Sequence, residues 1–243
     1  MDQLTDFADD RLISGCIYCG GIADTRDHVP SRVFLEPPYP DNLPVVGSCQ
    51  TCNQGFSQDE QYVVCLMEAA LAGSADPDKI TRPSVARSLR RAPALQARIA
   101  AARTEQDGQV RWAVEEDRIA TVMLKLAKGH AAFELSQPCR ERPDHFWCGP
   151  LITVSDKERH AFEAPHEQIM LGEVGSRRLQ RLIVAHAYLQ SEEGKAPFAG
   201  MLLNDWTEVQ ERRYRYLAID DVGGIAVRIV ISEYLGCEVI WKR

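Results

Sequence analysis

Apolar residues recur with two different periods along the chain, and each period predicts a different kind of element. Between residues 115 and 135 they return every three or four positions, which indicates a helix with one buried face. Residues 55–72 and 176–190 have the same period and are expected to be helical. Residues 213–217 alternate and residues 225–231 form an apolar run, with a turn of aspartates and glycines between them. The pattern therefore predicts an α+β chain that ends in antiparallel strands.

Prolines and glycines add detail to this pattern. The first fifty residues hold several breaker residues, which leave room only for short strands near 24–29 and 43–48. Pro93 is expected to split residues 82–103 into two short helices. Residues 237–241 are expected to add a last strand to the sheet. His130 and His186 fall on the apolar faces of expected helices and are interpreted as core residues.

Composition narrows the class of protein. The 243 residues are 45% hydrophobic and 26% charged, which is typical of a globular chain and excludes a mainly disordered one. No apolar run is long enough to span a bilayer, and the acidic start, residues 1–6, does not have the pattern of a secretory signal. We therefore expect a cytoplasmic protein with no membrane partner.

The net charge of −7 argues against a passive, basic DNA-coating protein. It allows an enzyme that contacts phosphates through a metal ion and one local basic patch. Residues 82–103 contain six arginines and no acidic residue. These candidates for nucleic-acid contacts are Arg82, Arg87, Arg90, Arg91, Arg98 and Arg103. The alternative is an ordinary solvated helix face.

Four of the eight cysteines form two Cys-x-x-Cys pairs, Cys16 with Cys19 and Cys49 with Cys52. Two such pairs match the spacing of zinc knuckles, in which four thiolates hold one structural Zn²⁺. The alternative is four incidental free thiols. A redox role is disfavoured, because neither pair has the strand-then-helix setting of a thioredoxin-like motif. Cys139 and Cys148, with the nearby His145, match no metal-binding spacing and are expected to be incidental.

Other polar residues lie between and just after these pairs, in a definite order. Asp27 and His28 come first, Asn42 follows, and Asn53 comes directly after the last cysteine of the second pair. Over residues 13–65 this order resembles the HNH endonuclease family, in its branch with two flanking Cys-x-x-Cys zinc knuckles. The resemblance implies an N-terminal ββα-metal module. The chain would then comprise this module in 1–80, a basic helical connector in 81–110 and an α+β domain of unknown role in 111–243.

The resemblance also implies roles for individual residues. His28 would activate the water, and Asn42 would brace the loop and help to orient the ring of His28, so these two are the expected catalytic residues. Asp27 and Asn53 would hold a catalytic Mg²⁺ or Mn²⁺ through hard oxygen ligands. The sequence departs from the family in having Asn53 where many relatives have histidine, and in having no lysine soon after it. Without that lysine, contacts to the phosphate would have to come from other residues.

Together these features predict a metal-dependent HNH endonuclease that hydrolyses phosphodiester bonds in nucleic acid, with DNA as the expected partner. The resemblance suggests a setting in restriction or phage defence. The alternative is a non-catalytic, zinc-stapled module that binds nucleic acid or protein. The sequence leaves open the form of the substrate, the cutting specificity, and whether the chain forms an oligomer or has a protein partner.

Overall fold

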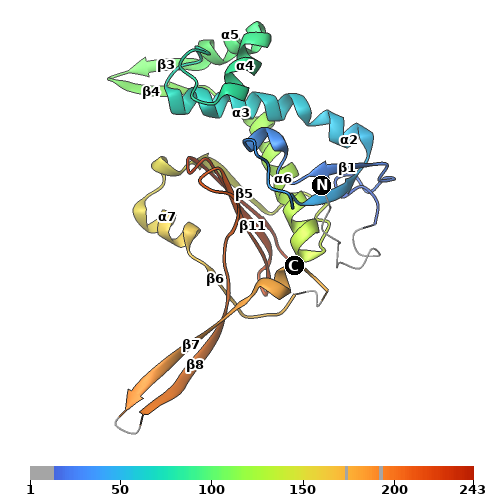
Figure 1. Cartoon of the computed structure of the whole chain (residues 1–243), viewed down its shortest axis with the longest axis vertical. Helices are drawn as coiled ribbons and strands as arrows, with labels where there is room; N and C mark the ends of the chain where they lie inside the picture. The colour runs from blue at the N-terminus through green and yellow to red at the C-terminus, as the bar shows by residue number, and fades with distance from the viewer. Residues whose placement is uncertain (1–13, 173–174, 192–193) are drawn as a thin grey trace. The chain divides into compact units, whose positions relative to one another are not determined.

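The computed structural model describes the backbone of residues 14–172, 175–191 and 194–243 (Figure 1). The acidic start on which the expectation of no secretory signal rests lies outside these residues. The helices are α2 (Gln50–Gly55), α3 (Ser57–Ala72), α4 (Pro83–Arg91), α5 (Pro93–Ala102), α6 (Glu116–Leu135) and α7 (Asp156–Glu163), with short 3-10 turns η1 (Arg32–Phe34), η2 (Leu151–Thr153) and η3 (Arg178–Arg181). The strands are β1 (Thr25–His28), β2 (Val45–Ser48), β3 (Arg103–Gln106), β4 (Gln109–Trp112), β5 (His145–Pro150), β6 (His166–Gln168), β7 (Ile183–Ser191), β8 (Gly194–Asn204), β9 (Thr207–Gln210), β10 (Tyr214–Asp221), β11 (Gly224–Ile231) and β12 (Leu235–Trp241).

The chain divides into two compact units. Unit 1 comprises the described residues up to Gln50 together with Leu126–Arg243, and unit 2 comprises Thr51–Lys125. The divisions fall within α2 and α6, so each of these helices contributes to both units. Unit 1 thus combines an N-terminal and a C-terminal stretch of the chain. The ranges expected from the sequence, 1–80, 81–110 and 111–243, are each continuous.

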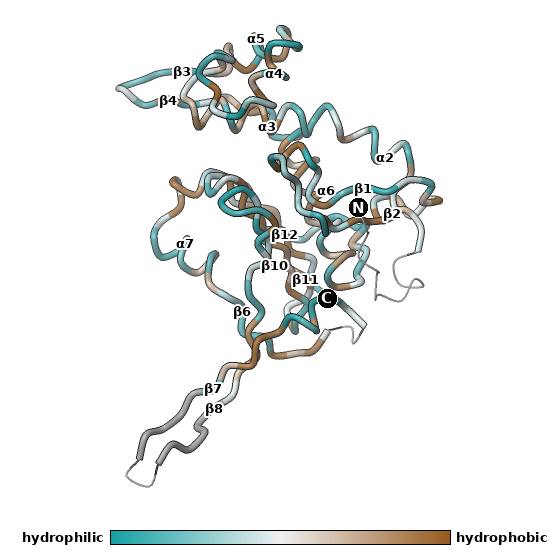
Figure 2. The backbone as a smooth tube through the Cα atoms, viewed as in Figure 1, coloured by the Kyte–Doolittle hydropathy of each residue, from teal (hydrophilic) through white to brown (hydrophobic). Residues whose placement is uncertain are grey.

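Unit 1 is built on a five-stranded antiparallel sheet with the order β5-β12-β11-β10-β9. Hydrophobic residues follow one another along its central strands (Figure 2). One face packs against the C-terminal half of α6, where His130 stacks on Tyr216 with a centroid separation of 3.7 Å. The other face packs against α7 through a cluster that includes Leu151, Phe162 and Val230. The predicted α+β class and the strands predicted at the C-terminal end are confirmed.

The segment with β1 and β2 belongs to the same unit. The sequence left room for two short strands here, and in the structure they pair antiparallel, with Asp27 opposite Val46. The connection between them is attached to the large sheet, because the amide of Glu36 donates to Gln210 at 2.8 Å and the Glu36 carboxylate pairs with Arg213 at 2.7 Å. The cysteine-containing segment is thus packed onto the C-terminal sheet.

Unit 2 is mainly helical. Pro93 begins α5 immediately after α4 has ended at Arg91, which confirms the predicted split. Inside the unit, the hydroxyl of Tyr62 accepts a hydrogen bond from the amide of Glu115 at 2.8 Å. The buried Lys125 pairs with Glu60 at 2.5 Å. A buried ion pair of this kind specifies how α3 and α6 pack, because either charge alone would be costly to bury.

The helix predicted at residues 176–190 is wrong. The structure has the short turn η3 there, followed by strand β7, which pairs with β8 to form a long antiparallel hairpin. Ile183 and Val184 are both exposed, whereas a helix face would bury one of two neighbours. His186 is also exposed on β7, so its expected place in the core is wrong, while His130 lies fully buried as expected.

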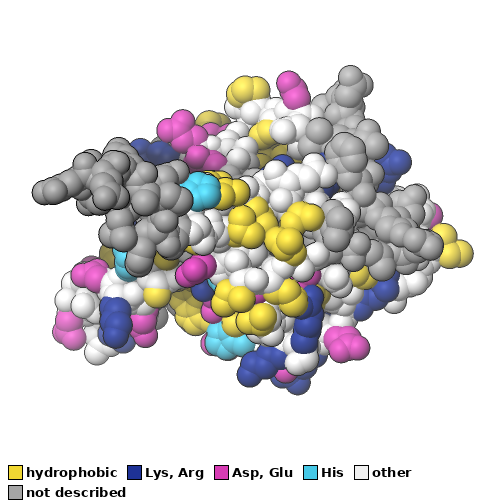
Figure 3. All heavy atoms as spheres, turned by 90° about the horizontal axis from the view of Figure 1, so that it is seen from below, with side chains coloured by type: hydrophobic (Ala, Val, Ile, Leu, Met, Phe, Trp, Pro, Cys, Tyr) yellow, Lys and Arg dark blue, Asp and Glu magenta, His cyan; other side chains and the backbone are white. Residues whose placement is uncertain are grey.

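Across the described ranges, no helix combines the length and the apolar character that crossing a membrane requires. The face drawn in Figure 3 mixes hydrophobic, acidic and basic side chains. Such mixing is ordinary for a protein surface.

Candidate metal centre and catalytic segment

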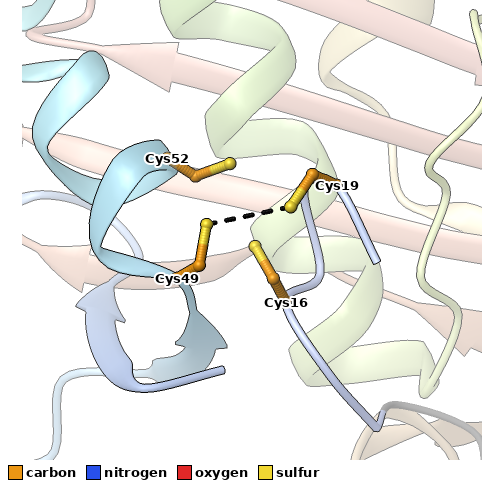
Figure 4. Close-up of side chains that lie close together, drawn as sticks. All are labelled: Cys16, Cys19, Cys49 and Cys52. Atoms are coloured by element: carbon orange, nitrogen blue, oxygen red, sulfur yellow. Dashed lines mark hydrogen bonds between the residues drawn. The ribbon is translucent and has the colours of Figure 1, made fainter. Parts of the chain in front are cut away.

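The two Cys-x-x-Cys pairs come together at one point (Figure 4). The sulfur atoms of Cys16, Cys19, Cys49 and Cys52 all lie within 4.8 Å of one another, and those of Cys19 and Cys49 are 3.8 Å apart. Four thiolates at about 2.3 Å from a tetrahedral Zn²⁺ would be separated by about 3.8 Å. The donor atoms and their spacing therefore fit a structural zinc ion, as the sequence predicted.

Local backbone geometry presents these sulfurs. The first pair is carried by a tight turn in which the amide of Cys16 donates to the carbonyl of Gly21 at 2.7 Å and that of Gly20 donates back to Cys16 at 2.8 Å. Gly20 has a φ of 82°, a conformation that residues with a Cβ rarely adopt. The second pair brackets the start of α2, where the Asp24 side chain accepts from the amide of Gln50 at 2.8 Å and so caps the helix.

Hydrogen bonds favour the charged form of the first cysteine. Burial opposes ionisation of the Cys16 thiol, but the backbone groups of Cys49, Cys19 and Tyr18 and the Cys19 side chain donate to its sulfur, and its pKa falls to about 6. A thiolate is the form that binds a metal. The site is thus prepared electrostatically for a cation.

Strand β1 carries the candidate catalytic pair. Asp27 is 6% exposed and accepts a hydrogen bond from the Tyr18 hydroxyl at 2.7 Å. His28 is the last residue of the strand and is half-buried. Tyr18 lies inside the first Cys-x-x-Cys pair, so one side chain connects the metal centre to the candidate pair. Tyr18 could not be expected here from the sequence, because no spacing rule indicates a contact between a Cys-x-x-Cys turn and a strand residue nine positions later.

The two candidate asparagines lie in different settings. Asn42 is exposed in the connection between β1 and β2, where it lines a cavity of about 60 Å³ with Arg181 and Tyr216. Asn53 is half-buried in α2, directly after Cys52. Asp27 and His28 therefore occupy consecutive positions at the end of one strand, and the two asparagines lie on the loop and the helix that flank β2.

The arginines of α4, α5 and β3 are not equivalent. Arg82 is 3% exposed and faces Glu68 at 3.8 Å, so its guanidinium is not accessible to a phosphate and it leaves the candidate set. Arg103 donates to the carbonyl of Gly73 at 2.8 Å and pairs with Glu105. The remaining four of the six predicted residues are Arg87, Arg90, Arg91 and Arg98, and all of them are exposed.

Two of these four already pair with acids. Arg90 pairs with Asp78 at 2.6 Å and Arg98 with Glu115 at 3.4 Å, both at the surface, where such pairs are weak and exchangeable. Arg87 and Arg91 face no carboxylate within ion-pair distance in the part of the chain that the structure describes. These two are the arginines best placed to meet a phosphate.

A buried polar network lies on the α6 side of the large sheet. The ring of His130 is within 2.8 Å of the Tyr214 hydroxyl, and burial lowers the pKa of His130 to about 3. The Tyr216 hydroxyl donates to Glu134, which also pairs with Arg181 at 3.0 Å. Burial raises the pKa of both tyrosines, and the negative charge of Glu134 adds to the effect at Tyr216. These groups are neutral or paired, as a core requires.

No protein-family model, no curated protein and no solved structure matches this chain. The interpretation of the site therefore rests on its own residues and their geometry.

Proposed function

We propose that this chain is a metal-dependent endonuclease with an HNH-type site, which hydrolyses DNA phosphodiester bonds. One observation carries the proposal: the Asp27–His28 pair ends a β-strand that is enclosed between two converging cysteine pairs. The partner strand β2 leads directly into α2, which carries Asn53. This order of strand, strand and helix around a Cys-x-x-Cys metal centre supports the resemblance noted in the sequence.

His28 would act as the general base. It is half-buried at the end of β1, and imidazole is the side chain that most often accepts a proton near neutral pH. It would remove a proton from the attacking water as that water approaches the phosphorus. Asn42, on the flanking loop, would hydrogen-bond within this region and keep the ring and the water oriented.

Asp27 and Asn53 would hold a Mg²⁺ or Mn²⁺ ion, for which carboxylate and amide oxygens are suitable ligands. When bound, such an ion stabilises negative charge on the phosphate and on the leaving oxygen. Tyr18 would orient Asp27 through its 2.7 Å hydrogen bond, in the way that outer hydrogen bonds fix metal ligands. Arg87 and Arg91 would add sequence-independent phosphate contacts.

A second candidate function is a zinc-stapled binding module without catalysis. The observation that favours it is that Asp27 is nearly buried and already bonded to Tyr18, an arrangement that also serves a purely structural role. The lack of a lysine after Asn53 points the same way. The two functions differ in what His28 does.

The test is cleavage of plasmid and of short single- and double-stranded DNA with Mg²⁺, Mn²⁺ or chelator. His28→Ala should lower the rate at least ~10²-fold while zinc content and DNA binding stay unchanged, because the imidazole moves a proton and holds no zinc. His160→Ala, at an exposed position in α7, is the matched control and should cut like the wild type. A wild type that cuts none of these substrates, or a His28→Ala variant that cuts at the wild-type rate, would favour the binding module.

A further inference from the structure

Two cysteines outside the metal centre lie directly opposite each other. Cys148 on the edge strand β5 pairs in register with Cys237 on β12. Opposed residues of an antiparallel pair have Cα atoms about 4.5–5.5 Å apart, and disulfides need about 4.4–6.8 Å. The backbone therefore already has the spacing of a cross-strand disulfide, although both thiols are reduced.

The two thiols differ in access. Cys237 is 1% exposed, whereas Cys148 is half-buried on the outermost strand of the sheet. Burial raises the pKa of Cys237 well above its usual range, and the hydrogen bond between the two side chains raises it further. Cys148 is thus the more exposed residue of the two, and Cys237 lies beside it as a protonated thiol.

The remaining cysteines lack this arrangement. Four of them form the metal centre. Burial raises the pKa of Cys65 and of Cys139 to about 12, and neither residue lies in a strand with a second cysteine opposite it. Among the eight cysteines, Cys148 and Cys237 are therefore the pair that is both close and accessible without a metal.

We propose that Cys148 and Cys237 form a reversible redox pair, oxidised by hydrogen peroxide or another small peroxide. The Cys148 thiol releases its proton to solvent, and the thiolate sulfur attacks one oxygen of hydrogen peroxide. The O–O bond breaks and the departing hydroxide takes up a proton from solvent, so the products are a sulfenic acid on Cys148 and one water. The Cys237 sulfur then attacks the Cys148 sulfur, the S–O bond breaks, and the S–S bond forms as its thiol proton leaves with the hydroxyl group in a second water. Each disulfide consumes one peroxide, and a dithiol reductant reverses it.

The position gives the bond a structural effect. β5 is held to the sheet on one side only, and the disulfide would fasten it to β12 at the middle of their ladder. It would also close a loop of roughly 90 residues, a length for which cross-links restrict the unfolded chain strongly. The oxidised protein should therefore unfold at a higher temperature, and the amides of β5 should exchange more slowly. This inference is independent of the proposed endonuclease activity.

The test treats the zinc-loaded full chain with stoichiometric hydrogen peroxide, then alkylates the free thiols under denaturing conditions and maps the peptides. The expected product is one peptide linked through Cys148 and Cys237, with the zinc retained and the link removed by dithiothreitol. Cys139→Ser is the matched control and should form the same link. Cys148→Ser should form none, and its thiol loss should be at least tenfold slower.

Two results would overturn the proposal. One is accumulation of sulfinic acid on Cys148 with Cys237 still free. The other is a Cys148→Ser variant that loses thiols as fast as the wild type. Because Cys148 lies on an edge strand and is half-buried, its serine variant keeps the test valid even where Cys237→Ser does not fold.

Discussion

Gly129, in the middle of α6, lets this helix approach the residue that follows His28. A Cβ atom at position 129 would lie 2.5 Å and 2.8 Å from the two γ carbons of Val29 and 3.2 Å from its Cβ. Val29 is fully buried, so it has little room to move away. Gly129→Ala therefore has two opposite effects on stability. The higher helix propensity of alanine stabilises the protein, and crowding against Val29 destabilises it.

The sizes of these two effects decide whether the free energy of unfolding rises or falls. Glycine to alanine inside a helix stabilises by about 1 kcal/mol, whereas overpacking a core costs about 1–3 kcal/mol. All three branch atoms of a buried valine would be crowded, so we take the cost from the upper half of that range. Gly129→Ala should then lower the free energy of unfolding by about 1–2 kcal/mol.

Urea unfolding of the zinc-loaded protein measures this change as a shift of the midpoint at constant slope. Gly55→Ala is the control, because a Cβ at this exposed position in α2 meets no atom within 4 Å and should be neutral or slightly stabilising. Val29→Ala combined with Gly129→Ala should cost at least ~1 kcal/mol less than the sum of the single changes. A Gly129→Ala variant as stable as the wild type would refute the close packing. Under the proposed function, displacement of Val29 should also slow cleavage.

Three further predictions concern the metal centre, the core histidine and the exposed arginines. Wild-type protein should hold about one zinc per chain, and Cys49→Ser should lose it; a full equivalent of zinc in the variant, by elemental analysis, would contradict the four-cysteine site. The pKa of His130 is about 3 when folded, below its unfolded value, so the unfolded chain binds more protons and stability should fall as pH drops from about 6.5 toward 3. His130→Gln should reduce the slope of unfolding free energy against pH by up to ~1.4 kcal/mol per pH unit. Urea titrations at several pH values measure both proteins, and equal slopes for the two would argue against a neutral buried imidazole. Changing Arg87 and Arg91 together to Glu should weaken DNA binding and reduce the slope of log affinity against log salt by about 2, while an unchanged slope would mean that this surface is only solvated.

Short-range features could be predicted from the sequence. The helical period of residues 115–135, the break at Pro93 and the turn between β10 and β11 all depend on neighbours in the chain, and all are present in the structure. The pairing of Cys16 and Cys19 with Cys49 and Cys52 followed from spacing and thiol chemistry alone. Such features depend on the backbone preferences of neighbouring residues, or on the fixed spacing of cysteines around a zinc ion. Both can be recognised in the order of residues along the chain.

Other features depend on which distant segments meet. The helical period of residues 176–190 did not decide their structure, because pairing with β8 makes residues 183–191 the strand β7. Arg82 has the charge of a phosphate contact but lies buried beside Glu68. The bond from Tyr18 to Asp27 and the opposition of Cys148 and Cys237 arise from turn geometry and strand register. The sequence by itself determined most of the local elements and the four cysteines of the candidate zinc site. The tertiary structure alone decided burial, register and side-chain partners, because these depend on long-range packing that no local pattern encodes.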